Sequence, residues 1–312
     1  MDISKNLKYF FILPAVLTIL SLVALAAWGL KPGIDLVGGS SLQVTYPAGR
    51  PPVDMVRDAV SNEKLGLGEV RVQPTGDFGY ILRQRDLSVD EKNTLMQPLR
   101  NMGEMEEDQF TSIGPSLGAE LLRKAWIAIA LVVLCTVLFI AFAFRKVSSV
   151  DAAAHRTGLA SWKYGVVAIV TLLHDVILPV GLFALLGYTH GAEVDALFIV
   201  ALLTILGISI NDTIVVFDRI RENLKRNEES NRHEEFKEVV GRSITQTITR
   251  SINTSVTVII VLLALFFIGP AATKDFALTL TVGMIAGTYS SIFLASPLLV
   301  VWDGWSRNRK AA

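Results

Sequence analysis

The sequence predicts a polytopic α-helical membrane protein with six transmembrane helices and an extracytoplasmic, ferredoxin-like α+β domain between the first and second helices. Hydrophobic residues make up 51% of the 312 residues and the mean hydropathy is positive, which excludes a disordered chain and is unusual for a soluble domain. Apolar runs of about 18 or more residues, the length that crosses roughly 30 Å of hydrocarbon as a helix, recur along the chain. One long polar segment separates the first run from the others.

Five of the six apolar runs are clear and one is interrupted by polar residues. They are approximately Phe10 to Leu30, Ala125 to Phe144, Tyr164 to Gly187, Leu197 to Phe217, Ile252 to Ile268 and Phe276 to Trp302. The last run is long and contains Gly283, Gly287 and Pro297, so we expect a tilt or a kink in this helix.

The first run has two interpretations. Lys5 and Lys8 precede it, and the small residues at 24–26 resemble the cleavage site of a signal peptide. Its apolar length of about 20 residues is long for the core of such a peptide. We therefore expect a retained helix with a cytoplasmic N-terminus, the alternative being a cleaved leader.

Basic residues in short loops favour the cytoplasmic side of the membrane. The loops after the second and fourth runs carry Arg145, Lys146, Arg156, Lys163, Arg219, Arg221, Lys225, Arg226, Arg232, Lys237 and Arg242. Of the short loops on the opposite side, Gly187 to Asp195 has no Lys or Arg and Gly269 to Asp275 has only Lys274. We expect both termini in the cytoplasm, and the chain then divides into helix 1 with its N-terminus (1–30), an extracytoplasmic α+β domain (31–123), and helices 2 to 6 with cytoplasmic loops and C-terminus (124–312).

The domain at 31–123 shows alternating and helical apolar patterns in turn. Strands are expected at Ser41–Tyr46, Glu69–Gln73, Tyr80–Arg85 and Met105–Ile113, and helices at Val53–Lys64 and from Ser88 to about Asn101. Ser88 and Glu91 have the spacing of a capping box. Acidic residues in the last strand favour an edge position, and the order β-α-β-β-α-β is that of ferredoxin-like folds.

Several classes of function are disfavoured by what the sequence contains. The net charge is zero, so nucleic acid is not an expected partner, and the single cysteine, Cys135, lies in an apolar run. An internal disulfide or a cysteine metal site is therefore not expected. We find no pairing of nucleophile and base and no phosphate-binding loop, so we expect neither an enzyme nor a cofactor.

Charged and polar groups interrupt the apolar runs at three places: His174 with Asp175, Asn211 with Asp212, and Arg250. An ionised side chain at mid-bilayer costs at least about 2.5 to 3.5 kcal/mol, so such residues usually face a bundle interior or a wet cavity. Asp212 lies about 9 Å from the inner edge of its run at 1.5 Å per residue, and Arg250 approaches from the same side. We expect these two side chains to be in contact.

A buried aspartate beside a permanent cation suits proton movement, because a change in their separation changes which protonation state is favoured. The alternative is a structural ion pair that locks two helices together. His174 has the alternative role of a hydrogen bond between helices, and Asp218 with Arg219 that of charged anchors at the membrane boundary.

Motifs along nearly the whole chain together resemble the SecF family. They are the run Gly33 to Gly39 (GIDLVGG, with Asp35, Gly38 and Gly39), Gly114-Pro115, His174-Asp175, Asn211-Asp212, the run Val215 to Asn223 (VVFDRIREN, with Asp218 and Arg219), and Thr245-Gln246-Thr247 with Arg250. The resemblance implies the resistance-nodulation-division superfamily and places the family's functional aspartate and arginine at Asp212 and Arg250. Asp175, His174 and Asn211 are further candidates for proton coupling.

The resemblance also implies partners and a location. Members of the family work with SecD beside the SecYEG channel in the bacterial cytoplasmic (inner) membrane, surrounded by lipid, and use the proton-motive force to draw preproteins outward. Two alternatives remain at this point: a passive scaffold of the channel, and an exporter of lipids or small molecules from the same superfamily.

Overall fold

The computed structural model describes residues 3–61, 65–143, 161–230 and 234–311, and these fall into two units. The helical unit comprises Met1–Gly29, Ala128–Leu186 and Leu197–Ala312, and the α/β unit comprises Leu30–Ile127 and Gly187–Ala196. Some residues used above lie outside the described ranges: Lys64, Phe144, Arg145, Lys146, Arg156 and Arg232.

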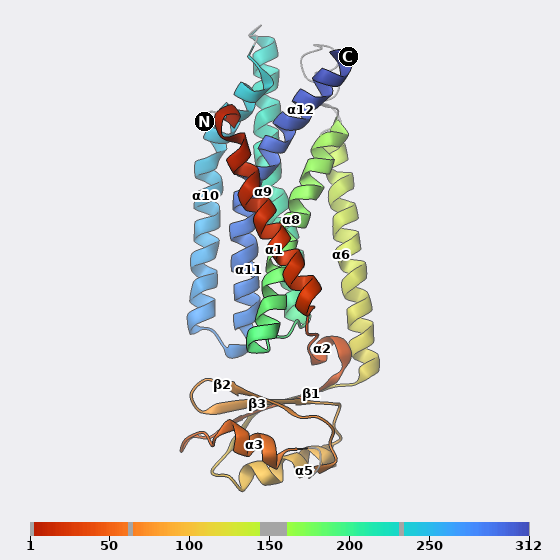
Figure 1. Cartoon of the computed structure of the whole chain (residues 1–312), viewed down its shortest axis with the longest axis vertical. Helices are drawn as coiled ribbons and strands as arrows, with labels where there is room; N and C mark the ends of the chain where they lie inside the picture. Colours follow the sequence, from red (N-terminus) through yellow and green to blue (C-terminus); the bar gives the residue numbers. More distant parts are fainter. Residues whose placement is uncertain (1–2, 62–64, 144–160, 231–233, 312) are drawn as a thin grey trace. The chain divides into compact units, whose positions relative to one another are not determined.

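Six helical stretches in the described ranges are long and apolar enough to cross a membrane, which confirms the expected number. The helices are α1 (Ile3–Trp28), α6 (Pro115–Ala143), α8 (Ser161–His190), α9 (Ala196–Glu229), α10 (Phe236–Ile268), α11 (Ala271–Ser290) and α12 (Ser296–Ala311). The sixth stretch contains both α11 and α12 (Figure 1). Between these two, the residues Ser291–Ala295 form a π-helical turn, η1, just before Pro297. The tilt or kink expected in this run stays a prediction.

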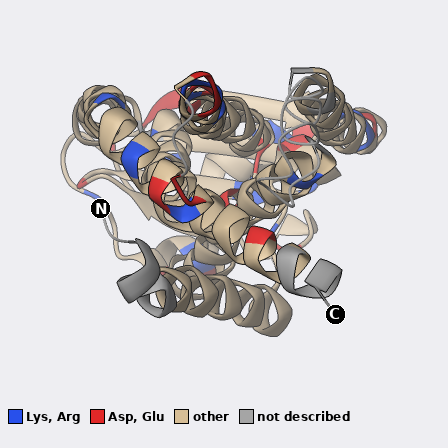
Figure 2. Cartoon of the chain, turned by 90° about the horizontal axis from the view of Figure 1, so that it is seen from above, with Lys and Arg blue, Asp and Glu red and all other residues tan. Residues whose placement is uncertain are grey.

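Several helices extend well beyond their predicted apolar runs. Helix α6 begins at Pro115, well before the predicted Ala125, because proline is favoured at the first helical position and the polar turn after it has good helix formers. Helices α9 and α10 continue as helices beyond their apolar runs and form a charged hairpin. Seen from above in Figure 2, most of the visible helical ribbon is tan, and the charged residues form short blue and red patches.

The helices pack through a buried apolar core and through glycines that admit close contact. The core draws on α6, α8, α9, α10, η1 and α12 and includes Phe217, Ile244 and Leu299. A Cβ atom on Gly181 would lie 2.4 Å from Ser21 Cα, so helices α8 and α1 touch at this point. Helix α1 is thus part of the helical bundle.

The α/β unit has the predicted β-α-β-β-α-β order. Its elements are β1 (Gly39–Thr45), α3 (Val53–Ala59), β2 (Arg71–Thr75), β3 (Gly79–Gln84), α5 (Val89–Arg100) and β4 (Glu106–Ile113), with a short helix α2 (Ile34–Val37) before them. The sheet is antiparallel in the order β2-β3-β1-β4, which is the ferredoxin-like arrangement and places β4 at an edge as expected.

One face of the sheet is covered by α3 and α5 (Figure 1). Alternate residues of β1 and β3, among them Leu42 and Leu82, are fully buried there against Leu95 and Leu99. Tyr46 Oη donates a hydrogen bond of 3.1 Å to the Leu99 carbonyl, and burial raises the pKa of Tyr46 to about 12. This tyrosine is therefore a neutral core residue at physiological pH.

The capping box at the start of α5 forms as predicted. Glu91 N donates to Ser88 Oγ over 3.3 Å, and Ser88 N donates to Glu91 Oε2 over 2.9 Å. The hydrogen bond from Arg85, together with those from Ser88, lowers the pKa of Glu91 to about 2. Because this pKa is below the ordinary value of about 4.5, the contribution of Glu91 to stability is present above that pH and is lost as the pH falls toward 2.

Replacing the cap residue tests this local account. Ser88→Ala should destabilise α5 by about 1 kcal/mol, because the amide of Glu91 loses its acceptor. Amide hydrogen exchange of residues 89–100 in the full-length protein should accelerate accordingly. Thr94→Ala, which removes an exposed hydroxyl bonded only to the Asp90 carbonyl, is the matched control and should change exchange little. Equal acceleration in both variants would contradict the capping role.

Candidate functional site

Asp212 lies on α9 and is hydrogen-bonded by hydroxyl groups from two other elements. Ser251 Oγ on α10 donates to Asp212 Oδ1 over 2.7 Å, and Ser291 Oγ in η1 donates to Asp212 Oδ2 over 2.7 Å. Both serines are buried and Asp212 is half-buried. The carboxylate thus joins three parts of the helical unit at one point.

The expected contact between Asp212 and Arg250 is wrong for this structure. Both residues lie in the described part of the chain, and no hydrogen bond or ion pair of 4.0 Å or less joins them. The reason is the direction of the side chains, not the depth of the residues. Ser251 faces Asp212, and its neighbour Arg250 points about 100° away around α10 and is exposed.

Asn211 also lies on the surface of the helical unit. It precedes Asp212 on α9 and is exposed, like Arg250 on α10. Each of these two polar residues directly precedes a residue of the Asp212 hydrogen-bond network. The structure therefore separates the predicted group into a half-buried carboxylate with serine donors and two exposed polar residues beside it.

Asp175 on α8 is the second membrane-depth carboxylate, and it is completely buried. His174 Nδ1 lies 2.9 Å from Asp175 Oδ1, and Asp175 Oδ2 accepts hydrogen bonds from Ser290 Oγ, over 2.8 Å, and from Ser209 Oγ. His174 Nε2 is buried and has no partner among the described residues. The same histidine lines an apolar cavity of about 420 Å³ between α1, α8 and α11.

Four serines of the two carboxylate networks were not predicted from the sequence: Ser209, Ser251, Ser290 and Ser291. Single serines are common in membrane helices as packing residues, so they gave no signal by themselves. The pair Ser290-Ser291 inside the last apolar run was the available clue, because two adjacent hydroxyls point about 100° apart around a helix and can reach two different neighbours.

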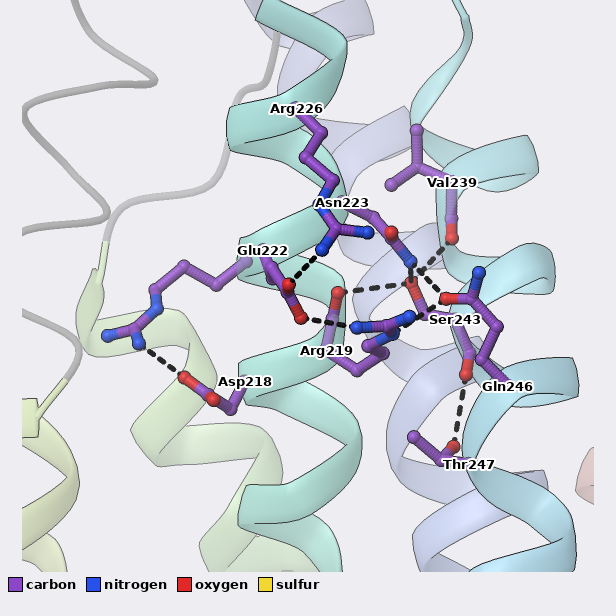
Figure 3. A network of polar contacts seen from close by, with 10 residues as sticks. Asp218, Arg219, Glu222, Asn223, Arg226, Val239, Ser243, Gln246 and Thr247 are labelled. Atoms are coloured by element: carbon purple, nitrogen blue, oxygen red, sulfur yellow. Dashed lines mark hydrogen bonds and ion pairs between the residues drawn. The ribbon is translucent and has the colours of Figure 1, made fainter. Parts of the chain in front are cut away.

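The long sequence motif after Asp212 builds a polar clamp between α9 and α10 (Figure 3). Asn223 Nδ2 donates to Ser243 Oγ and to Gln246 Oε1, each over 2.8 Å, and Arg219 Nε donates to Gln246 Oε1 over 2.7 Å. Asn223 is 2% exposed and its bond to Ser243 is buried, whereas the bond between Arg219 and Gln246 lies at the surface. The clamp holds the two antiparallel helices in the register that brings Ser251 opposite Asp212.

The charges around the clamp are arranged along the surface of α9. Arg219 and Arg226 both pair with Glu222, and Arg221 pairs with Asp218 (Figure 3). Asp218 is exposed and contacts only its own helix in the part of the chain that the structure describes. Within that part, Asp218 and Arg219 stabilise the hairpin and do not contact either membrane-depth carboxylate.

The motif from Gly33 to Gly39 positions the start of α9 within the α/β unit. Asp35 Oδ2 accepts a hydrogen bond of 3.2 Å from the amide of Ala196, the first residue of α9. Gly38 has φ 83° and its Cβ would lie 2.6 Å from Pro115 Cα, and Gly39 has φ 141° and would meet the Gln84 carbonyl at 2.7 Å. Only glycine fits at both positions.

The loop before α9 is also held by an ion pair. Glu193 Oε2 lies 3.3 Å from Arg83 Nε, and the Glu193 side chain is 11% exposed. Burial raises the pKa of Glu193, and the cations Arg83, Arg71 and Lys31 oppose this shift. The Asp35 and Glu193 contacts together connect the loop at 187–196 to the α/β unit.

Comparison with known proteins identifies the family. The family model described as "Protein export membrane protein SecD/SecF, C-terminal" matches residues 94–155 and 159–305, more than half of the chain. The chain belongs to the SecD/SecF family. The protein translocase subunit SecF of Thermobaculum terrenum is 42% identical over 317 residues, covering 97% of this chain and 94% of that protein. The SecF subunit of Synechocystis sp. is 34% identical, with 98% and 95% covered.

Other relatives are longer than this SecD/SecF family member. The protein translocase subunit SecDF of Bacillus subtilis is 30% identical over 313 residues, which are 100% of this chain and 39% of that protein. The crystal structure of SecDF from Thermus thermophilus, a translocon-associated membrane protein, superposes with a TM-score of 0.82 at 32% identity. It covers 97% of this chain, and the chain spans 39% of its length. This SecF-like chain is therefore a multi-pass membrane protein whose fold corresponds to one part of SecDF.

The clamp can be tested by stability measurements. Asn223→Ala should lower the free energy of unfolding by about 1 to 3 kcal/mol, because it leaves buried hydroxyl and amide groups without a partner. Arg226→Ala removes a surface ion pair whose arginine side chain is 58% exposed, and should cost less than about 1 kcal/mol. Denaturant unfolding of the full-length protein in detergent measures both values. A smaller loss for Asn223→Ala than for Arg226→Ala would contradict the role of the clamp.

Proposed function

We propose that this chain is a SecF-type subunit of the bacterial Sec machinery that works with SecD beside the SecYEG channel. It couples the proton-motive force to the outward movement of preproteins across the cytoplasmic (inner) membrane. The observation that carries the proposal is the carboxylate of Asp212 at membrane depth, hydrogen-bonded by Ser251 and Ser291 from two neighbouring elements. The names of the SecF and SecDF relatives support the role in translocation.

The hydroxyl donors permit a change of protonation without loss of contacts. A serine hydroxyl donates to a carboxylate and accepts a hydrogen bond from a carboxylic acid. Asp212 therefore keeps both partners when it gains or loses a proton, because the hydrogen bond at the protonated oxygen reverses while the other oxygen continues to accept from its serine. The charge of α9 at this depth then changes, and the packing of α10 and η1 around it responds.

The free energy of placing a charge in the bilayer and the energy available from the membrane potential are of similar size. An ionised side chain at mid-bilayer costs about 2.5 to 3.5 kcal/mol on insertion scales. One elementary charge moved through 100 mV contributes roughly 2.3 kcal/mol. A proton gradient is therefore strong enough to shift an equilibrium between two packings of the helices that differ in the charge of Asp212.

The exposed position of Arg250 gives it a role at a subunit interface. Asn211 and Arg250 lie on the surface of this chain, and the SecDF relatives contain more than twice its length. We assign this polar surface to the contact with SecD, so that the guanidinium supplies a fixed charge beside the carboxylates of the assembled complex. Asp175 and His174 belong to the same proton-coupling group through Ser209 and Ser290.

The basic residues in the loops indicate which side of the membrane each part of the chain faces. The basic residues near 163, 219–226 and 237–242 face the cytoplasm with both termini, so the domain at 31–123 lies outside and meets the emerging preprotein. The helices contact membrane lipid. The proposal includes no covalent chemistry, no cofactor and no nucleic acid. The scaffold alternative is favoured by one observation, since Asp212 also joins three structural elements.

A substitution at Asp212 separates coupling from scaffolding. Asp212→Asn keeps the size and hydrogen-bonding capacity of the side chain but cannot ionise, so export should lose nearly all of its dependence on the proton gradient while SecD still co-purifies. Gradient-driven export from vesicles that carry the complete machinery, with and without a protonophore, measures this. Asp218→Asn, on the exposed face of the same helix, should retain the dependence.

The opposite pattern supports a scaffold. If the Asp212→Asn complex still responds to the gradient and instead co-purifies with less SecD, the carboxylate is a structural connection and the coupling proposal is wrong.

A further inference from the structure

Two carboxylates on neighbouring helices, the buried Asp175 and the half-buried Asp212, contact consecutive residues of one turn. Asp175 on α8 accepts from Ser290 Oγ over 2.8 Å, and Asp212 on α9 accepts from Ser291 Oγ over 2.7 Å. Consecutive Cα atoms are about 3.8 Å apart, and side chains of adjacent helical residues point about 100° apart. One peptide unit therefore connects two proton-binding groups that belong to different helices.

We propose that Asp175 and Asp212 form one coupled proton site, joined through the positioning residues Ser290 and Ser291 at the start of η1. The inference rests on the proposed function, since it concerns the same proton-coupling group. It adds that the two carboxylates do not gain and lose protons independently.

Each of the two serine hydroxyls has an alternative acceptor. Ser290 Oγ also lies 3.1 Å from the Gly287 carbonyl, and Ser291 Oγ lies 3.1 Å from the Thr288 carbonyl. When a carboxylate is ionised, its serine donates to it; when the oxygen that faces this serine carries the proton and donates to it, the serine hydroxyl turns to the carbonyl one turn back. The same switch is thus built twice, at adjacent residues.

The two serines that contact Asp175 and Asp212 lie at the start of the π-helical turn. Single π-helical turns inside α-helices are frequent at functional sites. Ser296 Oγ donates to the Ser291 carbonyl over 3.4 Å. Ser291 therefore takes part in two side-chain hydrogen bonds, one through its hydroxyl and one through its backbone carbonyl. A change of protonation at one aspartate alters the turn that positions the serine of the other aspartate.

A glycine on α11 leaves room for the contact between Asp175 and Ser290. A Cβ atom on Gly287 would lie 3.6 Å from Asp175 Oδ2 and 3.2 Å from Ser209 Cβ. The absence of a side chain at this position lets α11 approach α8 and α9 closely, which brings Ser290 within reach of the carboxylate.

The charge balance favours a shared proton. Asp175 is contacted by His174 on α8, Ser209 on α9 and Ser290 on α11, and Asp212 by Ser251 on α10 and Ser291 in η1. Within the described residues, His174 is thus the one titratable side chain in hydrogen-bond contact with either carboxylate. Two negative charges in one poorly solvated cluster interact strongly, and interacting groups titrate as a pair.

Infrared difference spectroscopy tests the coupling in the full-length protein in lipid nanodiscs. The carbonyl bands of protonated Asp175 and Asp212, assigned by Asp→Asn variants, are followed between pH 4 and 9. Asp212→Asn should move the titration midpoint of the Asp175 band by about one pH unit. Ser291→Ala removes a hydroxyl that contacts Asp212 and does not contact Asp175. This variant should nevertheless move the Asp175 midpoint. Ser291→Thr retains a hydroxyl and should restore the original midpoint.

The matched control is Thr281→Ala on α11. Thr281 is buried and its hydroxyl donates only to the Ala277 carbonyl, over 2.7 Å, so its removal should leave both midpoints unchanged. An Asp175 midpoint that is the same in wild type, Asp212→Asn and Ser291→Ala overturns the coupling. So does an Asp175 band that does not titrate in any of these proteins.

The readout is independent of export, so the two proposals fail separately. Independent midpoints, together with gradient-driven export that requires Asp212, overturn the coupled site alone. Coupled midpoints, together with export that does not require Asp212, overturn the proposed function and leave the coupled site in place.

Discussion

The main constraint on the helical unit is that a carboxylate within an apolar helix must be hydrogen-bonded. Asp212 satisfies this need with hydroxyls from α10 and η1, so its position determines how three parts of the helical unit pack. Asp175 satisfies it with His174, Ser209 and Ser290. Because an unpartnered polar group in such surroundings costs several kcal/mol, neither network can be broken without a compensating rearrangement.

Other features of the chain maintain these contacts. The clamp of Asn223, Ser243 and Gln246 aligns α9 with α10, and Asp35 accepts from the first amide of α9 inside the α/β unit. Each end of α9 is therefore held by polar contacts, while its middle carries the carboxylate. A helix held in this way can respond to a change of charge by repacking against its neighbours, without losing its own register.

Features that depend on neighbouring residues in the sequence, such as the helices and the helix cap, were predictable. The directions in which side chains point were not. Hydropathy predicted six helices, and the capping box at Ser88 predicted the start of α5, because both depend on neighbouring residues. The rotation of α10 was not predictable, because tertiary packing decides which face is buried; Ser251 occupies the position expected for Arg250. The π-helical turn at Ser291 required the structure for the same reason.

The central claim is that Asp212 exchanges a proton during export, and proton flux tests it most directly. Proteoliposomes would contain this chain with SecD, the SecYEG channel and a preprotein, and an internal pH-sensitive dye would report proton movement. The account predicts flux that rises and falls with preprotein movement and disappears in Asp212→Asn. Flux of unchanged size in Asp212→Asn, or gradient-driven export without any flux, would contradict it.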